Sequence, residues 1–396
     1  MKKNQITRRL RGILLLLLCA SVTSLTSCGD AEKKAAKSVT SEKEDKVVLY
    51  SWDEYFSEDV LAAFTEKTGI EVVYETFDNT DEMQEKLKSN PGKYDVLVLD
   101  DHTVRLLIGQ RLLRDLDRNA LTNFGNIDSR FLDEDGRFDK GNSYSVPYMT
   151  GTTLVAYRSD LIEVEDPSWN LFEKVEPGKV SLLDERLEVY GAAEFAMRDA
   201  AQFNSEEDRI AATTDTLVRL VKEKKIKFGT DNEMKEHLIS GDSHVAMMYS
   251  GDAALIAEEN EDLGIEFFIP KEGAMMWIDN FVVARDSSRP GAANKFINYM
   301  MEAKVAAESS NYLWYATPNK AARPYLNEEL LNDETIFPDE SVLAKCSFLE
   351  IGNSKRERLI NQGWRKVQQA VDSATPKNQD SKFVSKGEVL STTEED

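Results

Sequence analysis

The sequence predicts an α/β protein of two lobes, each built on a parallel sheet with helices on both faces. The chain has 396 residues, more than one hydrophobic core usually serves, which favours two lobes. Short apolar runs alternate with segments of helical periodicity, first over residues 46–113 and again over 179–269. Such an alternation of strand and helix is typical of a parallel sheet that is covered on both faces.

The first alternating set predicts three strands and three helices. The strands are expected over 47–50, 70–74 and 94–99, and the helices over 57–67, 81–89 and 104–113. Val60, Leu61 and Phe64 recur at helical spacing in the first helix, which ends before Gly69. An irregular stretch rich in Asp, Asn and Gly, residues 116–142, separates this set from the next.

The second set begins after two short extended runs, 144–149 and 152–157. We expect the chain to change lobe between these runs, at Thr150-Gly151. The further strands are predicted over 179–183, 244–248, 265–269 and 275–284. The further helices are predicted over 185–202, 208–224, 253–259, 290–301, 305–312, 339–344 and 355–374. We expect one lobe from residues 46–149 and 275–323, and a second from 150–274 and 324–374.

The N-terminus has the pattern of a targeting segment. Five basic residues precede an apolar run, 13–20, that is too short to span a bilayer. The stretch Leu25-Thr26-Ser27-Cys28 then resembles the lipobox of bacterial lipoproteins. We therefore expect residues 1–27 to be a signal peptide and Cys28 to carry lipid. Residues 28–45 and 375–396 are polar and lack an apolar face, so they are expected to be a flexible tether and a disordered tail.

Charge and cysteine usage narrow the functional classes. The formal charge of −22 argues against a nucleic-acid partner and is compatible with a cationic one, although a solvated acidic surface explains it equally well. Cys19 would leave with the signal peptide and Cys28 would be lipidated, so Cys346 alone remains. No intrachain disulfide is therefore expected in the mature protein.

The run Pro270 to Phe281 contains the first indication of a binding site. It feeds a strand in which Trp277 and Asp279 lie two residues apart and so share a face. An indole ring beside a carboxylate suits an organic cation, through cation–π attraction and a charge-assisted hydrogen bond. A buried Trp with an Asp that caps a turn is the alternative, and from this stretch alone it is the commoner arrangement.

Acidic residues also follow the other predicted strands. They occur in the stretches 52–55, 100–102, 184–188 and 249–252, and ligands of open α/β sheets bind at the carboxyl ends of the strands. Each stretch has a structural alternative: acids at a helix start are stabilised by the helix dipole by about 0.3–1 kcal/mol, and Asp252 is suited to capping the helix that follows it. Their recurrence at several strand ends favours one shared cleft.

Several segments together resemble one known family. The chain is similar to the bacterial polyamine-binding proteins of ABC importers, which bind spermidine and putrescine and have the type II periplasmic binding protein fold. The similarity runs from about residue 47 to about residue 370. The segments that carry it are Leu49 to Tyr55, Phe64 to Ile70, Tyr94 to Val98, Leu121 to Phe124, Val146 to Tyr148, Glu188-Val189, Pro270 to Asp279 and Tyr315 to Ala322.

The resemblance implies two α/β lobes, joined by two hinge crossovers, that close on an extended polycation. Transferred residue by residue, it implies a ligand site formed by Trp52, Asp53, Tyr55, Asp100, Glu185, Glu188, Tyr249, Asp252, Trp277, Asp279 and Tyr315. In the family, the positions of Trp277 and Asp279 hold the amine and its methylene chain centrally, and that of Glu188 closes on it from the second lobe.

Other positions compare less directly with the family. Tyr249 stands where a Trp is frequent, Asp252 matches an acid of the putrescine-type members, and Glu185 matches an acid of the spermidine-type members. After the third strand, where Pro-Ser is usual, this chain has Asp100-Asp101-His102. The added carboxylate would favour a longer amine or mark a changed specificity. A metal site at this triplet has weak support, and a solvated loop is the commoner structure.

The resemblance predicts a lipid-anchored solute-binding protein of the periplasm or cell surface that delivers polyamines to permease subunits. We expect no enzymatic activity, cofactor, metal or nucleic-acid partner, a monomeric state, and membrane contact through the lipid alone. The alternatives are the same fold with iron, thiamine or another cation, a polyamine sensor, and a lipid-anchored hydrolase. For a hydrolase, the sequence lacks a recognisable nucleophile elbow, phosphate loop or metal-binding histidine pair.

Overall fold

The computed structural model of the protein describes residues 44–77, 79–198, 202–348 and 354–374. The expected signal peptide, Cys28, most of the tether and the tail lie outside these ranges. Among the helices of the described residues, none combines the length and the apolar composition that crossing a bilayer requires.

The first half of the sheet is built as its sequence pattern predicts. Strands β1 (Lys46–Ser51), β2 (Glu71–Thr76) and β3 (Val96–Asp100) are parallel, in the order β2-β1-β3. Val47 and Leu49 face one apolar cluster and Val48 and Tyr50 face another. Both faces of these strands are therefore buried, which explains why their sequences are continuous apolar runs. The helices of this half are α1 (Glu58–Thr68), α2 (Thr80–Ser89), α3 (Asp101–Gly109), α9 (Pro290–Met300) and α10 (Ala303–Leu313).

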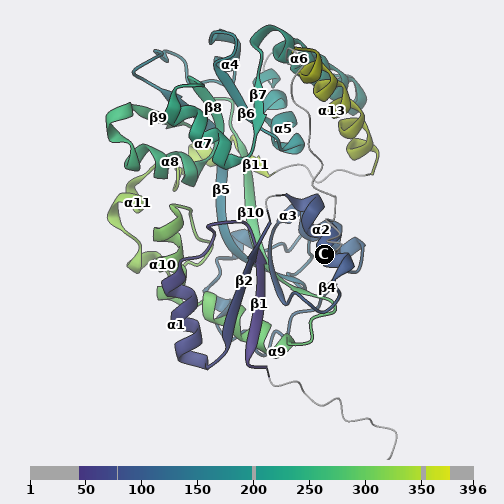
Figure 1. Cartoon of the computed structure of the whole chain (residues 1–396), viewed down its shortest axis with the longest axis vertical. Helices are drawn as coiled ribbons and strands as arrows, with labels where there is room; N and C mark the ends of the chain where they lie inside the picture. Colours follow the sequence, from purple (N-terminus) through teal and green to yellow (C-terminus); the bar gives the residue numbers. More distant parts are fainter. Residues whose placement is uncertain (1–43, 78, 199–201, 349–353, 375–396) are drawn as a thin grey trace, which may run out of the picture. The chain divides into compact units, whose positions relative to one another are not determined.

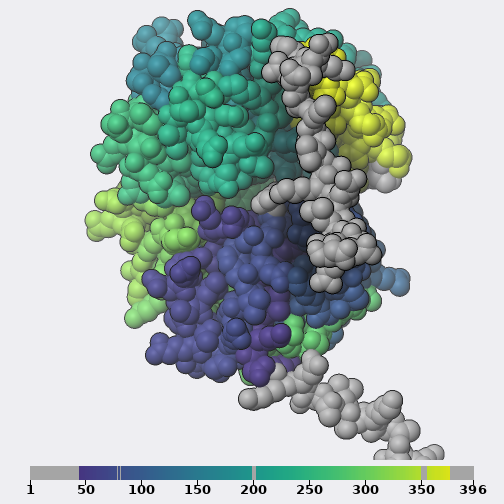
Figure 2. Space-filling model, viewed as in Figure 1, coloured from purple at the N-terminus to yellow at the C-terminus, as the bar shows by residue number. Residues whose placement is uncertain are grey.

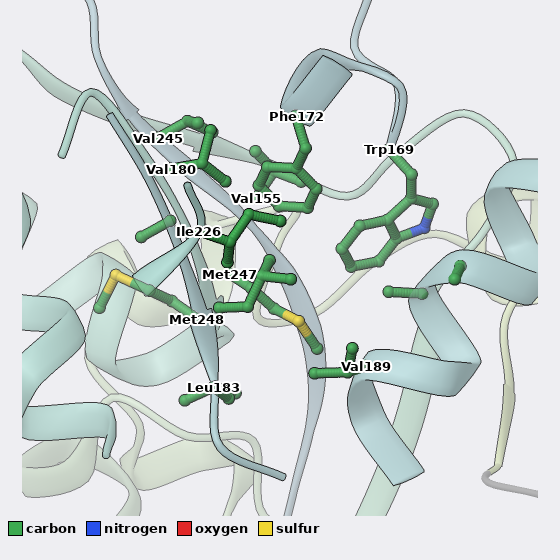
Figure 3. Close-up of a cluster of buried hydrophobic side chains, with 14 of the residues drawn as sticks. Val155, Trp169, Phe172, Val180, Leu183, Val189, Ile226, Val245, Met247 and Met248 are labelled. Carbon is green, nitrogen blue, oxygen red and sulfur yellow. The ribbon is translucent and has the colours of Figure 1, made fainter. Parts of the chain in front are cut away.

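The second half repeats the arrangement. Strands β7 (Lys227–Gly229), β6 (Val180–Leu183) and β8 (Val245–Tyr249) are parallel to one another. The apolar core of this half includes Val155, Val180, Met247 and Trp169, as Figure 3 shows. The helices of this half are α4 (Leu171–Lys174), α5 (Arg186–Met197), α6 (Glu206–Lys224), α7 (Asp231–Ser240), α8 (Ser250–Glu259) and α13 (Ser354–Ala374).

Two long strands connect the halves. Strands β5 (Ser145–Arg158) and β10 (Met275–Ala284) pair antiparallel with each other (Figure 1). Residues 145–152 of β5 pair with β10, and residues 153–157 pair with β8, so β5 changes partner between Thr152 and Thr153. Thr150-Gly151, where the sequence predicts a change of lobe, thus lies within one continuous strand. The strand β9 (Ile265–Phe268) also pairs with β5.

The fold is the two-lobed type II fold that the sequence predicts. Figure 2 shows the purple and blue residues of the first half and the teal residues of the second half in different parts of this face. The lobe boundaries given above stay a prediction. The short strand β11 (Ser347–Phe348) pairs with the start of β10. The remaining elements are β4 (Leu113–Arg114), α11 (Glu328–Asn332) and α12 (Glu340–Leu343).

Several local predictions are wrong. The helix expected over 185–202 is α5, which ends at Met197. The helix expected over 104–113 is α3, which begins at Asp101, because the Asp100 side chain accepts a hydrogen bond from the Thr103 N–H at 2.9 Å and caps the helix. Residues 113–114 form β4 instead of the last helical turn. The elements β7 and α7 were not predicted, although Thr230 and Glu233 form a capping box and Gly241 ends the helix.

A small-residue interface joins elements of the two halves. The alanines Ala254 of α8 and Ala306 and Ala307 of α10 lie in one buried cluster, together with Leu330 and Ile336. Alanine side chains allow the two helices to approach closely. Close packing next to the connecting strands restricts the relative arrangement of α8 and α10, which both carry residues near the site described below.

Gly273 lies just before β10, and its substitution tests how tightly the chain is packed where it enters this connecting strand. It has a φ of 99°, and an added Cβ would overlap the backbone oxygen of Lys345. Gly69 has a φ of 71° with nothing within 4 Å of an added Cβ, so it is a matched control for backbone strain alone. We expect Gly273→Ala to lower the free energy of unfolding by at least about 2 kcal/mol, and Gly69→Ala by about 1 kcal/mol. Urea unfolding of both variants measures this, and equal losses would contradict the packing argument.

Candidate functional site

The carboxyl ends of the parallel strands carry the candidate residues. β1 leads into Trp52-Asp53-Glu54-Tyr55, β3 ends at Asp100, β6 leads to Glu185, and β8 ends at Tyr249. In α/β sheets this end of the strands is where ligands bind. The connecting strand β10 carries Trp277 and Asp279, and Tyr55, Asp100 and Tyr249 from these strand ends lie next to them.

Four rings form what we call the aromatic cluster: Tyr55, Tyr249, Trp277 and Tyr315. The indole of Trp277 meets Tyr315 edge to face at 5.0 Å and Tyr249 at 5.8 Å between ring centroids. The Tyr55 and Tyr315 rings are 6.3 Å apart. An edge-to-face geometry is the favoured one for aromatic pairs and fixes the orientation of each ring. Residues that are up to 260 positions apart in the sequence are therefore held as one rigid surface.

Gly151 explains how the indole is accommodated. A Cβ at residue 151 would lie 2.5 Å from the Cζ2 atom of Trp277 and 2.9 Å from Oγ of Ser250. The ring therefore lies directly on the backbone of β5, where only glycine leaves enough room. The Nε1 atom of Trp277 is buried and has no hydrogen-bond partner within the described part of the chain.

Asp279 lies in the centre of this group. Its carboxylate accepts a hydrogen bond from the Tyr55 hydroxyl, and only 7% of the residue is exposed. Burial raises the pKa of Asp279 to about 7, the Tyr55 hydrogen bond lowers it, and the charges of Asp100 and Asp101 raise it. Asp100 is the residue that pairs with Asp279 across β3 and β10. The site thus concentrates negative charge around a carboxyl group that is shielded from water.

Glu188, on α5, brings a second buried carboxyl group from the other half. It is 6% exposed, and its Oε2 atom has no hydrogen-bond partner among the described residues. Burial raises the pKa of Glu188 to about 8, and the charges of Glu185, Asp100 and Asp101 also raise it. Asp100 and Asp101 of the first half thus act on a carboxyl group of the second half. Ionisation of Glu188 or Asp279 is energetically unfavourable in this buried environment unless a cation binds next to the carboxylate.

Asp252, in the first turn of α8, does not cap its helix as one interpretation of the sequence expected. Its Oδ2 atom accepts a hydrogen bond from the Tyr315 hydroxyl at 2.7 Å, and its Oδ1 atom lies 3.2 Å from Nζ of Lys235. Lys235, on α7, is also 3.8 Å from the Asp231 carboxylate. The acid that the resemblance assigned to the ligand is therefore already paired with a cation of the protein.

The Asp100-Asp101-His102 triplet is not a solvated loop. Asp100 is the N-cap of α3 and accepts a second hydrogen bond from the Thr103 hydroxyl at 2.6 Å. Asp101 is 2% exposed and forms an ion pair with Arg137. Burial raises the pKa of Asp101 to about 6, against the lowering effect of Arg137. Both carboxylates have structural roles here while their charge still acts on Asp279 and Glu188.

The other candidates lie at the edge of this group. Glu185 is the N-cap residue of α5, and its charge raises the pKa of both Glu188 and Tyr249, which places it nearby. The ring of Trp52 lies on Phe77, 4.5 Å between centroids, and Asp53 is exposed. Of the residues predicted from sequence, the structure brings Tyr55, Glu188, Tyr249, Asp252, Trp277, Asp279 and Tyr315 closest together.

Sequence reasoning missed Tyr148, Lys235 and Asp231. Tyr148 packs edge to face on Tyr55, 5.8 Å between ring centroids. The capping box of Thr230 would have revealed helix α7, but nothing in the sequence directs its Lys235 toward Asp252. Within the described ranges, no group of three or more His, Cys, Asp and Glu side chains is arranged to hold a metal ion.

Comparison with known proteins gives one consistent family. The sequence pattern described as bacterial extracellular solute-binding protein matches residues 59–338. A putrescine/cadaverine-binding protein of Pseudomonas aeruginosa is 32% identical over 336 residues, which are 82% of this chain and 93% of that protein. A putrescine-binding periplasmic protein of Escherichia coli is 29% identical over 335 residues, 81% of this chain and 90% of its own.

Solved structures agree with this result. The spermidine/putrescine ABC transporter substrate-binding protein of Streptococcus pneumoniae superimposes with a TM-score of 0.71 at 27% identity. The match covers 83% of this chain and 99% of that one. A lipoprotein of Treponema pallidum superimposes with a TM-score of 0.70 at 23% identity, which shows a shared fold.

The raised pKa of Glu188 predicts a pH-dependent stability difference. An ordinary Glu, as in the unfolded chain, has a pKa of 4.5, and the pKa of Glu188 in the folded protein is about 8. Between these two pH values the folded state binds a proton that the unfolded state does not, so the free energy of unfolding falls as the pH rises from 4.5 to about 8. Glutamine imitates the protonated form at every pH. We expect Glu188→Gln to gain at least about 1 kcal/mol in unfolding free energy relative to wild type between pH 5 and pH 8.

The measurement is urea unfolding of the ligand-free protein at both pH values. Glu66→Gln, at an exposed position on α1, is the control and is expected to show no such gain. A Glu188→Gln difference that does not change with pH would contradict the buried, unpaired state of this carboxyl group.

Proposed function

The chain belongs to the family of bacterial extracellular solute-binding proteins, and from this premise we propose that it captures polyamines, spermidine or putrescine or both, between its two lobes. The bound amine is then delivered to the permease subunits of an ABC importer. The observation that carries the proposal is the pair of buried carboxyl groups, Asp279 and Glu188, beside the aromatic cluster. Within the described residues, neither forms an ion pair.

The charge of the site supports a cationic ligand. An unpaired buried charge costs several kcal/mol, so a cleft with acids that lack a cation favours a ligand that brings one. When an ammonium binds beside Asp279 or Glu188, it stabilises the carboxylate and thereby lowers the pKa that burial has raised. Each charged hydrogen bond to an ammonium contributes roughly 1.5–3 kcal/mol.

The aromatic cluster supports an organic cation over a metal ion. Trp277, Tyr249, Tyr315 and Tyr55 present ring faces and edges, which are poor ligands for a hydrated metal but cover methylene groups well. Burial of the methylenes adds about 25 cal/mol per Å² of apolar area. A flexible chain of methylenes between ammonium groups matches this combination, and the spacing of the acids then selects the spacing of the amines.

The relatives support the same ligand class and the role in import. Their names describe binding of putrescine, cadaverine or spermidine, and one is the substrate-binding protein of an ABC transporter. The matched relatives are covered nearly to their full length, so the likeness includes both halves of the molecule. A binding role without catalysis follows from this family, and we propose it for this chain.

We further propose that the protein is anchored to a bacterial membrane by lipid on Cys28, with 28–45 as a tether. The support is the basic segment, the short apolar run and the lipobox-like Leu25-Thr26-Ser27-Cys28. Mass spectrometry of the mature protein is expected to find Cys28 as the modified first residue. Cys28→Ser is expected to abolish the modification, and an unmodified Cys28 in the mature wild-type protein would contradict the proposal.

The central test of the polyamine proposal is Asp279→Asn. We expect this change to weaken putrescine and spermidine binding at least about thirtyfold, since a buried charge–charge contact is lost. Asp59→Asn, which removes an exposed carboxylate on α1 outside the candidate site, is the matched control and is expected to change affinity less than about threefold. Titration calorimetry measures both. Unchanged affinity in a folded Asp279→Asn protein would remove Asp279 from the site.

A further inference from the structure

Lys235 is a cation that the protein itself supplies to the candidate site. It lies on the second turn of α7, and only 17% of its side chain is exposed. Its Nζ atom is 3.2 Å from the Asp252 carboxylate and 3.8 Å from that of Asp231. The Asp252 carboxylate in turn accepts the Tyr315 hydroxyl, and Tyr315 lies on Trp277. Lys235 is thus one side chain away from the aromatic cluster.

The environment of Lys235 keeps it charged. Burial lowers its pKa, but the carboxylates of Asp252 and Asp231 and the charge of Glu54 outweigh this effect, and the net shift is upward. Glu54 belongs to the segment after β1, in the other half of the sheet, whereas α7 and α8 belong to the second half. The ammonium of Lys235 therefore lies where acids of both halves act on it.

The two ends of the site consequently differ in charge balance. Asp279 and Glu188 are buried acids without an ion pair in the part of the chain that the structure describes. Asp252 is an acid of comparable position, next to the same rings, that already has an ion-pair partner in Lys235, which it shares with Asp231. A ligand ammonium at Asp252 would have to share the carboxylate with Lys235 and would meet like-charge repulsion at a short distance.

We propose that Lys235 is a specificity-determining residue, whose ammonium stands at Asp252 in place of a ligand ammonium. Ligand ammonium groups that bind to Asp279 and Glu188 then increase the affinity of the amine. An additional ligand ammonium next to Asp252 increases it little. This inference rests on the proposed function, because it specifies which amine the same cleft selects. A structural ion pair with no role in selection would affect stability and leave the preference among amines unchanged.

The experiment compares spermidine with two analogues in which one or the other terminal amine is replaced by a methyl group. Titration calorimetry gives the ratio of affinities between spermidine and each analogue. In wild type, spermidine is expected to bind no more than about threefold more tightly than the analogue that lacks the amine next to Asp252. In Lys235→Met, that ratio is expected to rise roughly tenfold or more, because Asp252 then lacks its cation.

Two further variants serve as controls. Lys235→Arg keeps the positive charge and is expected to keep the wild-type ratios. Lys235→Met combined with Asp252→Asn removes both partners and is expected to return the ratio to the wild-type value, which ties the effect to the carboxylate. If Lys235→Met does not give a folded protein, Lys235→Gln provides the same comparison.

The outcomes separate this inference from the proposed function. Wild type that binds spermidine, with ratios unchanged in folded Lys235→Met, overturns the role of Lys235 and leaves polyamine binding standing. A ratio that rises equally in Lys235→Arg also overturns it, since the charge would then not be the cause. If neither protein binds any of the three amines, the proposed function fails and this inference fails with it.

Discussion

The burial of unpaired carboxyl groups is the constraint on which the site depends. Asp279 and Glu188 are each less than a tenth exposed, yet neither has an ion-pair partner in the described chain. A folded protein normally avoids this arrangement, because a desolvated carboxylate costs several kcal/mol. It is tolerated here because burial raises the pKa of both groups, to about 7 for Asp279 and about 8 for Glu188, so that protonation lowers the cost. If these groups bind the amine as we propose, the stability of the empty protein and its affinity for an amine are linked through the same two groups.

The sheet brings these groups together across the two halves. Asp279 lies on β10, Glu188 on α5, and Tyr315 follows α10, so three elements that are remote in sequence each contribute one side chain. The antiparallel pair of β5 and β10 lies under the site, and Gly151 lets the indole of Trp277 rest on the strand itself. The contact between Trp277 and Tyr249 joins the connecting strand to the second half. A rearrangement of the lobes would therefore change ring contacts and carboxylate environments at once.

The acids of the cleft do not all have the same role. Asp100 caps α3, Asp101 is paired with Arg137, and Asp252 is paired with Lys235, whereas Asp279 and Glu188 form no ion pair with the residues that the structure describes. Internal pairing therefore distinguishes acids with a structural role from acids that we propose for the ligand. The family to which the chain belongs explains the common fold, and we propose that this distinction sets the selectivity of this chain.

The sequence by itself determined the fold class, most helices and strands, and the residue types of the site, because apolar periodicity and strand-end acids are local patterns. It placed β10 at its observed bounds and identified Tyr55, Glu188, Tyr249, Trp277, Asp279 and Tyr315 as candidates that the structure then brings together. It did not reveal α7, the start of α3 at Asp101, or the continuity of β5. Only the tertiary structure decided which acids are paired. The distance between Lys235 and Asp252 depends on how α7 packs beside α8, and no local pattern of the chain contains that information.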